Sequence, residues 1–141
     1  MPTRTAKAIW EGTIKAGKGH YETPSGSLRG SYSFVSRFEN GQGSNPEELL
    51  AAAEAACFSM ALSLELETAG KPPKRIETEA ACSIEKEGAG FAIKTIRLST
   101  RAEVPNLDPN EFAKIAETVK KTCPVSRALA GVEIEVAATL I

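Results

Sequence analysis

Apolar and polar residues follow several distinct periods along the chain, and these periods divide it into strands and helices. Three short stretches of alternation lie in the first 36 residues: Ala6–Trp10, a stretch at Ile14, and Leu28–Phe34. Alternation with a period of two is typical of half-buried strands, and Gly and Pro mark the turns between them. We therefore expect three strands, with turns at Gly12 and Pro24–Gly26, followed by a polar, glycine-rich loop, Glu39–Asn45.

The next segment has the pattern of one long apolar helix. Asn45 is a typical N-cap, Pro46 suits the first helical position, and Glu48 completes a capping box. The helix is predicted to run to about Ala69 and to end at Gly70. Its apolar stretch is too short to span a membrane, which takes about 20 apolar residues. Because it is apolar on nearly every face, we expect protein to enclose it.

The second half of the chain contains strands, then helices, then a last strand. Two strands are predicted, Arg75–Glu85 and Phe91–Val104, and the spacing of three between Ile93 and Ile96 indicates a bulge or two-sided burial. The remaining elements are a helix capped at Asp108, a short helix from Cys123–Pro124 to near Gly131, and a strand, Val132–Ile141.

This order of elements, βββ–α–ββ–αα–β, predicts an α+β fold with a mainly antiparallel sheet. A length of 141 residues is near the usual size of one domain, so we expect residues 1–141 to form a single domain. One small sheet cannot easily wrap a helix that is apolar all round. A second copy of the chain is therefore expected to complete its burial in a C2 homodimer.

Charge and composition narrow the classes of function. Seventeen Lys and Arg against eighteen Asp and Glu are scattered along the chain, which argues against nucleic acid as the main ligand. With His20 as the single histidine, one chain cannot build a metal site that needs two imidazoles, and we expect no metal. Met1 to Ala8 contains no apolar stretch, so we expect no signal peptide and a cytoplasmic protein with reduced thiols.

Three cysteines without a CxxC pair do not make a disulfide scaffold. Cys82 occupies a core-facing strand position, and packing explains it. Cys123 precedes Pro124 and is predicted to be the N-cap of the short helix. There, unpaired N–H groups and the helix dipole favour a thiolate, although a buried cysteine in a turn explains the residue equally well.

Cys57 lies in the middle of the apolar helix, where filling of the core is a sufficient explanation. Burial among apolar side chains raises the pKa of a thiol and makes it inert. For Cys57 to react, a cation must reach it, and Arg37 beside the glycine-rich loop is the candidate. If Arg37 is partly buried, its guanidinium needs an anion nearby. The alternative explanation is that Arg37 is a solvated charge at the end of a strand.

Two separated motifs resemble those of the OsmC/Ohr family. Asn45–Leu49 followed by Ala55–Leu62 (AACFSMAL) looks like the first cysteine motif, and Cys123–Ser126 (CPVS) resembles the second. Ile9–Gly12 (IWEG) and Arg37–Glu39 (RFE) are similar to the OsmC (osmotically inducible protein C) branch in particular. The resemblance covers essentially the whole chain, and the order of the two motifs makes it specific.

The resemblance implies a thiol-dependent peroxidase that reduces organic hydroperoxides to alcohols, and hydrogen peroxide less selectively, in oxidative and osmotic stress defence. Carried over by position, Cys57 is the peroxidatic nucleophile and Cys123 the resolving thiol, joined in a disulfide after each turnover. Arg37 holds the thiolate and polarises the peroxide, and Glu47 orients Arg37. The resemblance also implies that no cofactor is bound and that an external dithiol, a lipoylated protein or another, is the reductant.

The family's fold implies an intertwined homodimer, with sheets wrapped around long central helices and active sites at the subunit interface. Glu47 and Cys57 are ten residues apart on one helix, roughly 15 Å along its axis. We therefore expect the Arg37 and Glu47 that serve Cys57 to come from the partner subunit. Two alternatives remain open: a dimer that binds an apolar ligand with incidental thiols, and a redox sensor whose disulfide changes a surface.

Overall fold

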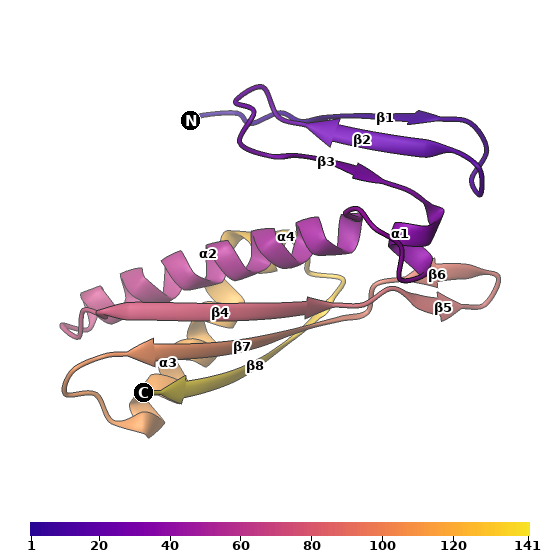
Figure 1. Ribbon diagram of the computed structural model, residues 1–141. Helices are drawn as coiled ribbons and strands as arrows, with labels where there is room; N and C mark the ends of the chain where they lie inside the picture. Colours follow the sequence, from indigo (N-terminus) through magenta and orange to yellow (C-terminus); the bar gives the residue numbers. More distant parts are fainter. The chain divides into compact units, whose positions relative to one another are not determined.

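The computed structural model describes residues 1–141, which form two compact units, Met1–Glu48 and Leu49–Ile141 (Figure 1). The first unit begins with an antiparallel three-stranded sheet. Its strands, in sheet order, are β1 (Lys7–Glu11), β2 (Lys18–Glu22) and β3 (Arg29–Tyr32). The expected number of strands is confirmed, but Ile14 lies in the turn between β1 and β2. That turn closes early because the Gly17 N–H donates to the carbonyl oxygen of Thr13, at 2.7 Å.

The residues after β3 form a short helix, α1 (Phe34–Phe38), where the alternation predicted the end of a strand. Its N-cap is Ser33, whose hydroxyl accepts from the Ser36 N–H at 3.2 Å, while Ser36 Oγ accepts from the Ser33 N–H at 2.8 Å. This reciprocal capping box starts a helix in spite of the apolar alternation. Arg37 therefore lies on a helix, and its explanation as a charge at the end of a strand is wrong.

The long helix α2 (Pro46–Thr68) begins and ends close to where the sequence predicts. Asn45 caps it through a 2.9 Å hydrogen bond from the Glu48 N–H to its side-chain oxygen. The Glu48 carboxylate accepts from the Ser44 hydroxyl at 3.0 Å, so it contributes to the cap through a different partner than the capping box predicts. Gly70 follows the helix with φ +73°, a left-handed conformation that favours glycine at a helix end.

The second unit contains a three-stranded sheet and a small hairpin. The strands of the sheet, in order, are β4 (Arg75–Cys82), β7 (Thr95–Glu103) and β8 (Glu133–Leu140); the hairpin is β5 (Glu85–Glu87) and β6 (Gly90–Ala92). β4 is antiparallel to β7, but β8 is parallel to it. The two strands predicted between residues 75 and 104 are each interrupted where the hairpin begins and ends. The spacing between Ile93 and Ile96 therefore marks a break between β6 and β7, and the expected bulge is wrong.

Two helices connect β7 to β8: α3 (Pro109–Thr122) and the five-residue α4 (Pro124–Ala128). The Asp108 carboxylate caps α3 as predicted, accepting from the next two free backbone N–H groups. Cys123 is both the C-cap of α3 and the N-cap of α4. Its position as an N-cap confirms the prediction from Cys123–Pro124, although its thiol makes no capping hydrogen bond.

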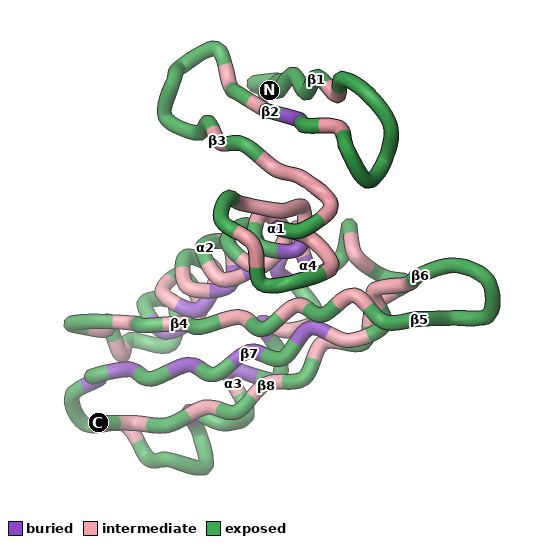
Figure 2. The backbone as a smooth tube through the Cα atoms, turned by 45° about the vertical axis from the view of Figure 1, so that its right-hand side comes forward, coloured by how far each residue is buried: buried purple, intermediate pink, exposed green.

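The core of the second unit lies on one face of its sheet. Alternate residues of the central strand β7 are buried and those between them are exposed, as the tube in Figure 2 shows. The helices α2 and α3 share one hydrophobic cluster with that face. It includes Phe58, Leu62 and Leu66 of α2, Ile96 and Leu98 of β7, and Phe112, Ala116 and Val119 of α3.

The two faces of α2 differ sharply in burial. Glu54, Phe58, Leu62 and Leu66 are fully buried at a spacing of four residues. On the other face, Met60 is 78% and Leu64 62% exposed, so one chain encloses this helix on one side only. With 23 residues and a window of mean hydropathy 1.6, α2 is long and apolar enough to cross a membrane, which corrects the expectation that it is too short. Core helices of proteins outside membranes also meet this criterion. Its buried face favours packing within protein.

Candidate active site

The structure brings two of the three cysteines together. Cys57 lies in the middle of α2 and Cys123 between α3 and α4; both are thiols, and their Sγ atoms are 2.9 Å apart. Cys123 reaches this position because its N–H donates to the Val119 carbonyl oxygen, which ends α3, and Pro124 starts a new helix in another direction. Cys82 is not part of this pair and lies on the core-facing side of β4, as expected from packing.

The surroundings of Cys57 within the second unit disfavour its thiolate. Burial and a hydrogen bond with Cys123 raise the pKa of Cys57 above the ordinary value of 9.0, and electrostatic interactions with Cys123 and Glu54 act in the same direction. A hydrogen bond from the backbone of Val125 acts in the opposite direction, but it is outweighed. At neutral pH these groups by themselves keep Cys57 protonated and a poor nucleophile. Chemistry at this thiol therefore needs a cation.

The first unit holds a guanidinium in a fixed position. Arg37 donates from Nε at 3.2 Å and from Nη2 at 3.0 Å to the same oxygen, Oε1, of Glu47. Glu47 is buried, whereas the Arg37 side chain is 36% exposed, so this cation remains accessible. The Arg37 guanidinium also lies 5.4 Å from the centre of the Phe38 ring, a cation–π distance. The pairing of Arg37 with Glu47 has the geometry that an orienting carboxylate requires.

The loop before α2 explains why these two residues meet. Arg37 is in α1 and Glu47 is in the first turn of α2. The Asn45 side-chain amide donates to the Ser36 carbonyl oxygen at 3.0 Å, and Ser36 Oγ donates to the Ser44 carbonyl oxygen at 2.7 Å. Both bonds close the glycine-rich loop and bring α1 to the beginning of α2.

A second polar pair near the thiols was not predicted from the sequence. Ser126 Oγ donates a short hydrogen bond to Oε1 of Glu54, which is fully buried. The signal was present in part, because Glu54 is the single charged residue between Leu49 and Leu64 and stands three residues before Cys57. Its partner is 72 residues away, and only the fold reveals it.

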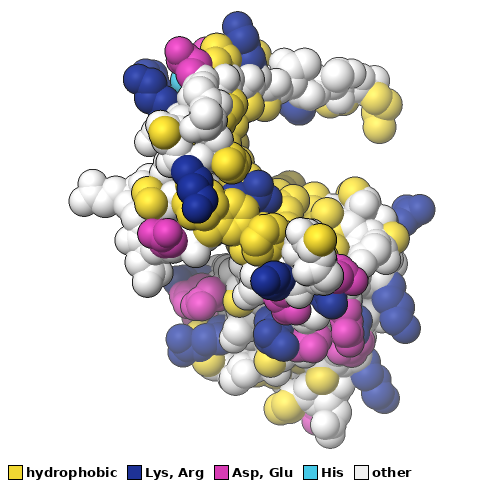
Figure 3. All heavy atoms as spheres, turned by 90° about the vertical axis from the view of Figure 1, so that its right-hand side faces the viewer, with side chains coloured by type: hydrophobic (Ala, Val, Ile, Leu, Met, Phe, Trp, Pro, Cys, Tyr) yellow, Lys and Arg dark blue, Asp and Glu magenta, His cyan; other side chains and the backbone are white.

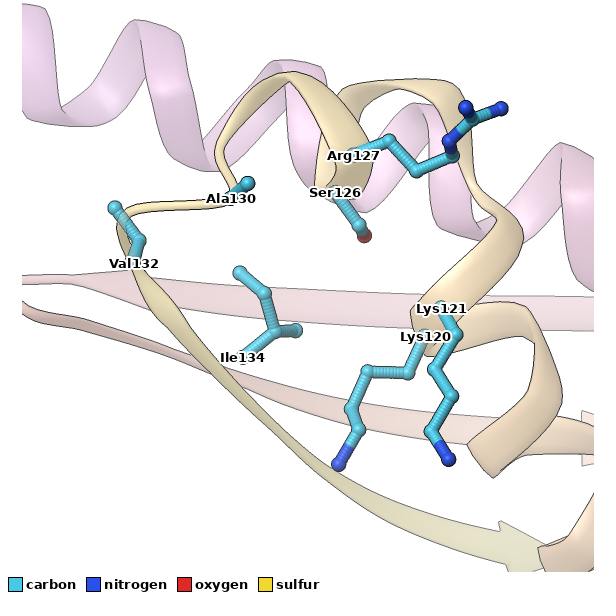
Figure 4. Close-up of a pocket in the computed structure, with 7 residues that line it drawn as sticks. All are labelled: Lys120, Lys121, Ser126, Arg127, Ala130, Val132 and Ile134. Atoms are coloured by element: carbon cyan, nitrogen blue, oxygen red, sulfur yellow. The ribbon is translucent and has the colours of Figure 1, made fainter.

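A hollow at α3, α4 and the start of β8 is not an anion site. A cavity of about 430 Å³ is lined by Lys120, Lys121, Ser126, Arg127, Ala130, Val132 and Ile134. In Figure 4 the Arg127 side chain points to the opposite side from those of Lys120 and Lys121, so the three cations do not converge. Acidic and basic side chains are interspersed on the face in Figure 3. No group of three or more His, Cys, Asp or Glu side chains is placed to hold a metal ion.

Comparisons with known proteins agree with this geometry. A family described as OsmC-like protein matches residues 39–137. Peroxiredoxin OsmC of Escherichia coli (strain K12) is 50% identical over 127 residues, which are 89% of each chain. An organic hydroperoxide resistance protein of Xanthomonas axonopodis pv. citri (strain 306) is 33% identical over 101 residues, 71% of this chain and 68% of that one.

Solved structures extend the similarity to the fold. The crystal structure of the organic hydroperoxide resistance protein OhrB of Bacillus subtilis superposes with a TM-score of 0.72 at 27% identity, covering 97% of this chain and 98% of that one. An organic hydroperoxide resistance protein OsmC from Legionella pneumophila gives a TM-score of 0.73 at 25% identity, covering 96% of each chain. The α+β fold and the resemblance predicted from the two cysteine motifs are both confirmed.

Proposed function

The chain belongs to the OsmC-like family, and from that premise we propose that it is a thiol-dependent peroxidase that reduces organic hydroperoxides to alcohols. It also reduces hydrogen peroxide, with less selectivity than organic hydroperoxides. The observation that carries this function is the 2.9 Å contact between the Cys57 and Cys123 sulfurs, two thiols 66 residues apart in the sequence. The names of its relatives, peroxiredoxin and organic hydroperoxide resistance protein, are those expected of such a thiol pair.

In the first step, the Cys57 thiolate attacks the terminal oxygen of the hydroperoxide. The O–O bond breaks, Cys57 becomes a sulfenic acid, and the alkoxide leaves as an alcohol after it takes up a proton. The cation that this step requires is Arg37, which stabilises the thiolate and donates hydrogen bonds to the departing oxygen. Glu47 keeps the guanidinium in position, and its bond to Arg37 through a single oxygen supports this role.

In the second step, Cys123 condenses with the sulfenic acid of Cys57. A disulfide forms and water leaves, which protects Cys57 from irreversible oxidation by more peroxide. An external dithiol, such as a lipoyl group, then reduces the disulfide by thiol–disulfide exchange and restores both thiols. The chain needs no bound cofactor for this cycle.

The functional unit is a homodimer in which Arg37 and Glu47 of one subunit serve Cys57 of the other. The exposed apolar face of α2, with Met60 and Leu64, supports a dimer because such side chains are usually covered in the working protein. The separation of Glu47 from Cys57 by ten residues of one helix supports the exchange between subunits.

A peptide map under non-reducing conditions tests the proposed function. Reduced protein receives one equivalent of tert-butyl hydroperoxide, remaining thiols are alkylated within seconds, and the digested peptides are identified by mass spectrometry. We expect a Cys57–Cys123 linkage and an alkylated Cys82. Alkylation of all three cysteines, with the peroxide unconsumed, would mean that Cys57 fills the core and that the enzyme proposal is wrong.

A further inference from the structure

Glu54 and Ser126 form a buried polar pair that the peroxidase steps above do not use. Glu54 is fully buried, Ser126 is 6% exposed, and the serine hydroxyl donates to Oε1 of the carboxyl group. The other oxygen, Oε2, is buried without a hydrogen-bond partner. A buried carboxyl group with an unpaired oxygen is unfavourable, and an apolar side chain of similar size would stabilise the chain more. Stability alone therefore does not explain this pair.

The pair joins the same two segments as the two thiols. On α2, Glu54 stands three residues before Cys57, and at the start of α4, Ser126 stands three residues after Cys123. Residues three apart lie on the same face of a helix. The hydrogen bond between Ser126 and Glu54 and the contact between the two sulfurs therefore lie side by side, across one interface between α2 and α4.

The position of Cys123 depends on where α4 is held. This helix has five residues, and a helix of that length has almost no stability of its own. Cys123 is its N-cap, so a shift of α4 along α2 moves the Cys123 sulfur directly. The bond from Ser126 to Glu54 is a side-chain contact that anchors α4 to the helix carrying Cys57, beside the backbone hydrogen bond of Val125 to Cys57.

We infer that Glu54 and Ser126 are positioning residues for disulfide formation, holding α4 so that the Cys123 sulfur stays within reach of oxidised Cys57. This inference rests on the proposed peroxidase function. In the step concerned, the S–O bond of the Cys57 sulfenic acid breaks and an S–S bond to Cys123 forms. The hydroxyl group leaves with the Cys123 proton as water; the Cys123 sulfur is oxidised and the Cys57 sulfur is reduced. Neither Glu54 nor Ser126 takes part in a bond change.

Position and charge can be separated at Glu54. Within the second unit, the side chains whose electrostatic interactions raise the pKa of Cys57 are the Cys123 thiol and the Glu54 carboxyl group. Glu54→Gln retains an oxygen that accepts from Ser126 and removes the charge. Glu54→Leu removes both, and Ser126→Ala removes the hydrogen bond while the carboxyl group stays. Glu67→Leu, on the exposed end of α2, is the matched control for the Leu substitution.

The experiment follows both oxidation steps in the full-length protein. Reduced protein is mixed with increasing tert-butyl hydroperoxide and quenched over time, and mass spectrometry measures Cys57 thiol, Cys57–Cys123 disulfide and Cys57 sulfinic acid. Urea unfolding of each reduced variant shows that it is folded. We expect Glu54→Leu and Ser126→Ala to form the disulfide about tenfold more slowly and to accumulate sulfinic acid at about tenfold less peroxide, the effect of one buried hydrogen bond. Glu54→Gln and Glu67→Leu should form it within about twofold of the wild-type rate.

Two results would overturn the inference. Wild-type disulfide rates in folded Ser126→Ala and Glu54→Leu would show that the bond does not position Cys123. A defect in Glu54→Gln as large as that in Glu54→Leu would show that the charge matters and the position does not. Neither result touches the proposed function, whose failure has a different signature: wild-type protein in which peroxide leaves the Cys57 thiol unchanged.

Discussion

The two units of the chain differ in the reactive groups they contain: the second unit holds the thiols and the first a cation. The second unit has two thiols in contact and a buried carboxyl group near them, and its groups raise the pKa of Cys57. The first unit has no cysteine, but it holds an accessible guanidinium fixed by the buried carboxylate of Glu47. A thiol without a cation is inert, and an exposed arginine without a thiol is ordinary. This division teaches that the second unit by itself lacks the cation that reactivity at Cys57 needs. In the function proposed here, Arg37 supplies that cation.

The largest effect is expected from the two thiols themselves. Cys57→Ser should lower peroxidase turnover by at least about a thousandfold, because a hydroxyl group is not a nucleophile toward an O–O bond at neutral pH. Cys123→Ser should consume one equivalent of peroxide to form the Cys57 sulfenic acid, and a second where that is oxidised to sulfinic acid, and then stop. Peroxide consumption with excess dithiol, and the mass of intact protein, measure both. Full turnover in Cys123→Ser would mean that the reductant attacks the sulfenic acid directly.

Removal of the cation should have the next largest effect. Arg37→Leu should lower kcat/KM by about 10²- to 10³-fold, as when one donor to a developing oxyanion is lost. It should also move the pH at which Cys57 becomes alkylated from below the ordinary value to above 9.0, where the second unit by itself places it. Arg37→Lys is the matched control and should retain part of the pKa effect, because it keeps the charge.

Rates of iodoacetamide reaction across a pH series measure this shift. The variant Arg101→Leu provides a control for the loss of an arginine, because Arg101 is an exposed residue of β7. An unchanged alkylation profile in Arg37→Leu would break the comparison between the two units, since Cys57 would then be activated by some other group.

The sequence predicted those parts of the site that local chemistry determines. The start of α2 at Pro46 and the place of Cys123 as an N-cap depend on neighbouring residues, and both are confirmed. Short-range competition explains the error at α1, where the capping box of Ser33 and Ser36 forms a helix within an apolar alternation. The parallel pairing of β8 depends on contacts about 38 residues apart, for which the sequence carries no local signal.

The partner of Glu54 escaped prediction for the same reason. A single glutamate in an apolar helix is visible in the sequence, but Ser126 is one of many serines and lies 72 residues away. The position of Arg37 beside Glu47 was expected from the family resemblance, and the geometry agrees with it. Residue periodicity alone offered no reason to pair them.

Mixing two inactive variants tests whether Arg37 acts across the dimer. In a heterodimer of Arg37→Leu with Cys57→Ser, one site combines an intact Cys57 with an intact Arg37 if the arginine comes from the partner. Random exchange of subunits should then restore about a quarter of wild-type activity, since half of the dimers are mixed and each has one intact site. Refolding the mixed subunits from urea and measuring peroxide consumption gives the result. Activity no higher than that of either parent would show that Arg37 serves the Cys57 of its own chain.

The smallest effect is expected on the pH dependence of the free energy of unfolding. The sign of this dependence shows whether Cys57 is governed by the second unit alone or also by Arg37. If the second unit alone determines Cys57, its folded pKa lies above the unfolded value, so the folded state holds its proton longer. The contribution of Cys57 to the free energy of unfolding is then fully present below pH 9 and is lost as the pH rises through the folded pKa. If Arg37 reaches Cys57 as proposed and lowers its folded pKa below the unfolded value, the same contribution instead increases with pH up to the unfolded value.

Each unit of pKa difference corresponds to about 1.4 kcal/mol. Urea unfolding of reduced protein measures how the free energy of unfolding changes with pH. The series runs from roughly pH 6 to pH 11, a range that brackets the folded and unfolded pKa values of Cys57. The contribution of Cys57 is the difference between wild type and Cys57→Ser, and again between Arg37→Leu and Arg37→Leu/Cys57→Ser. We expect the first difference to rise with pH toward 9 and the second to fall above 9. If the two differences changed with pH in the same direction, Arg37 would not act on the Cys57 thiol. The two units would then have to be considered as independent parts of the molecule.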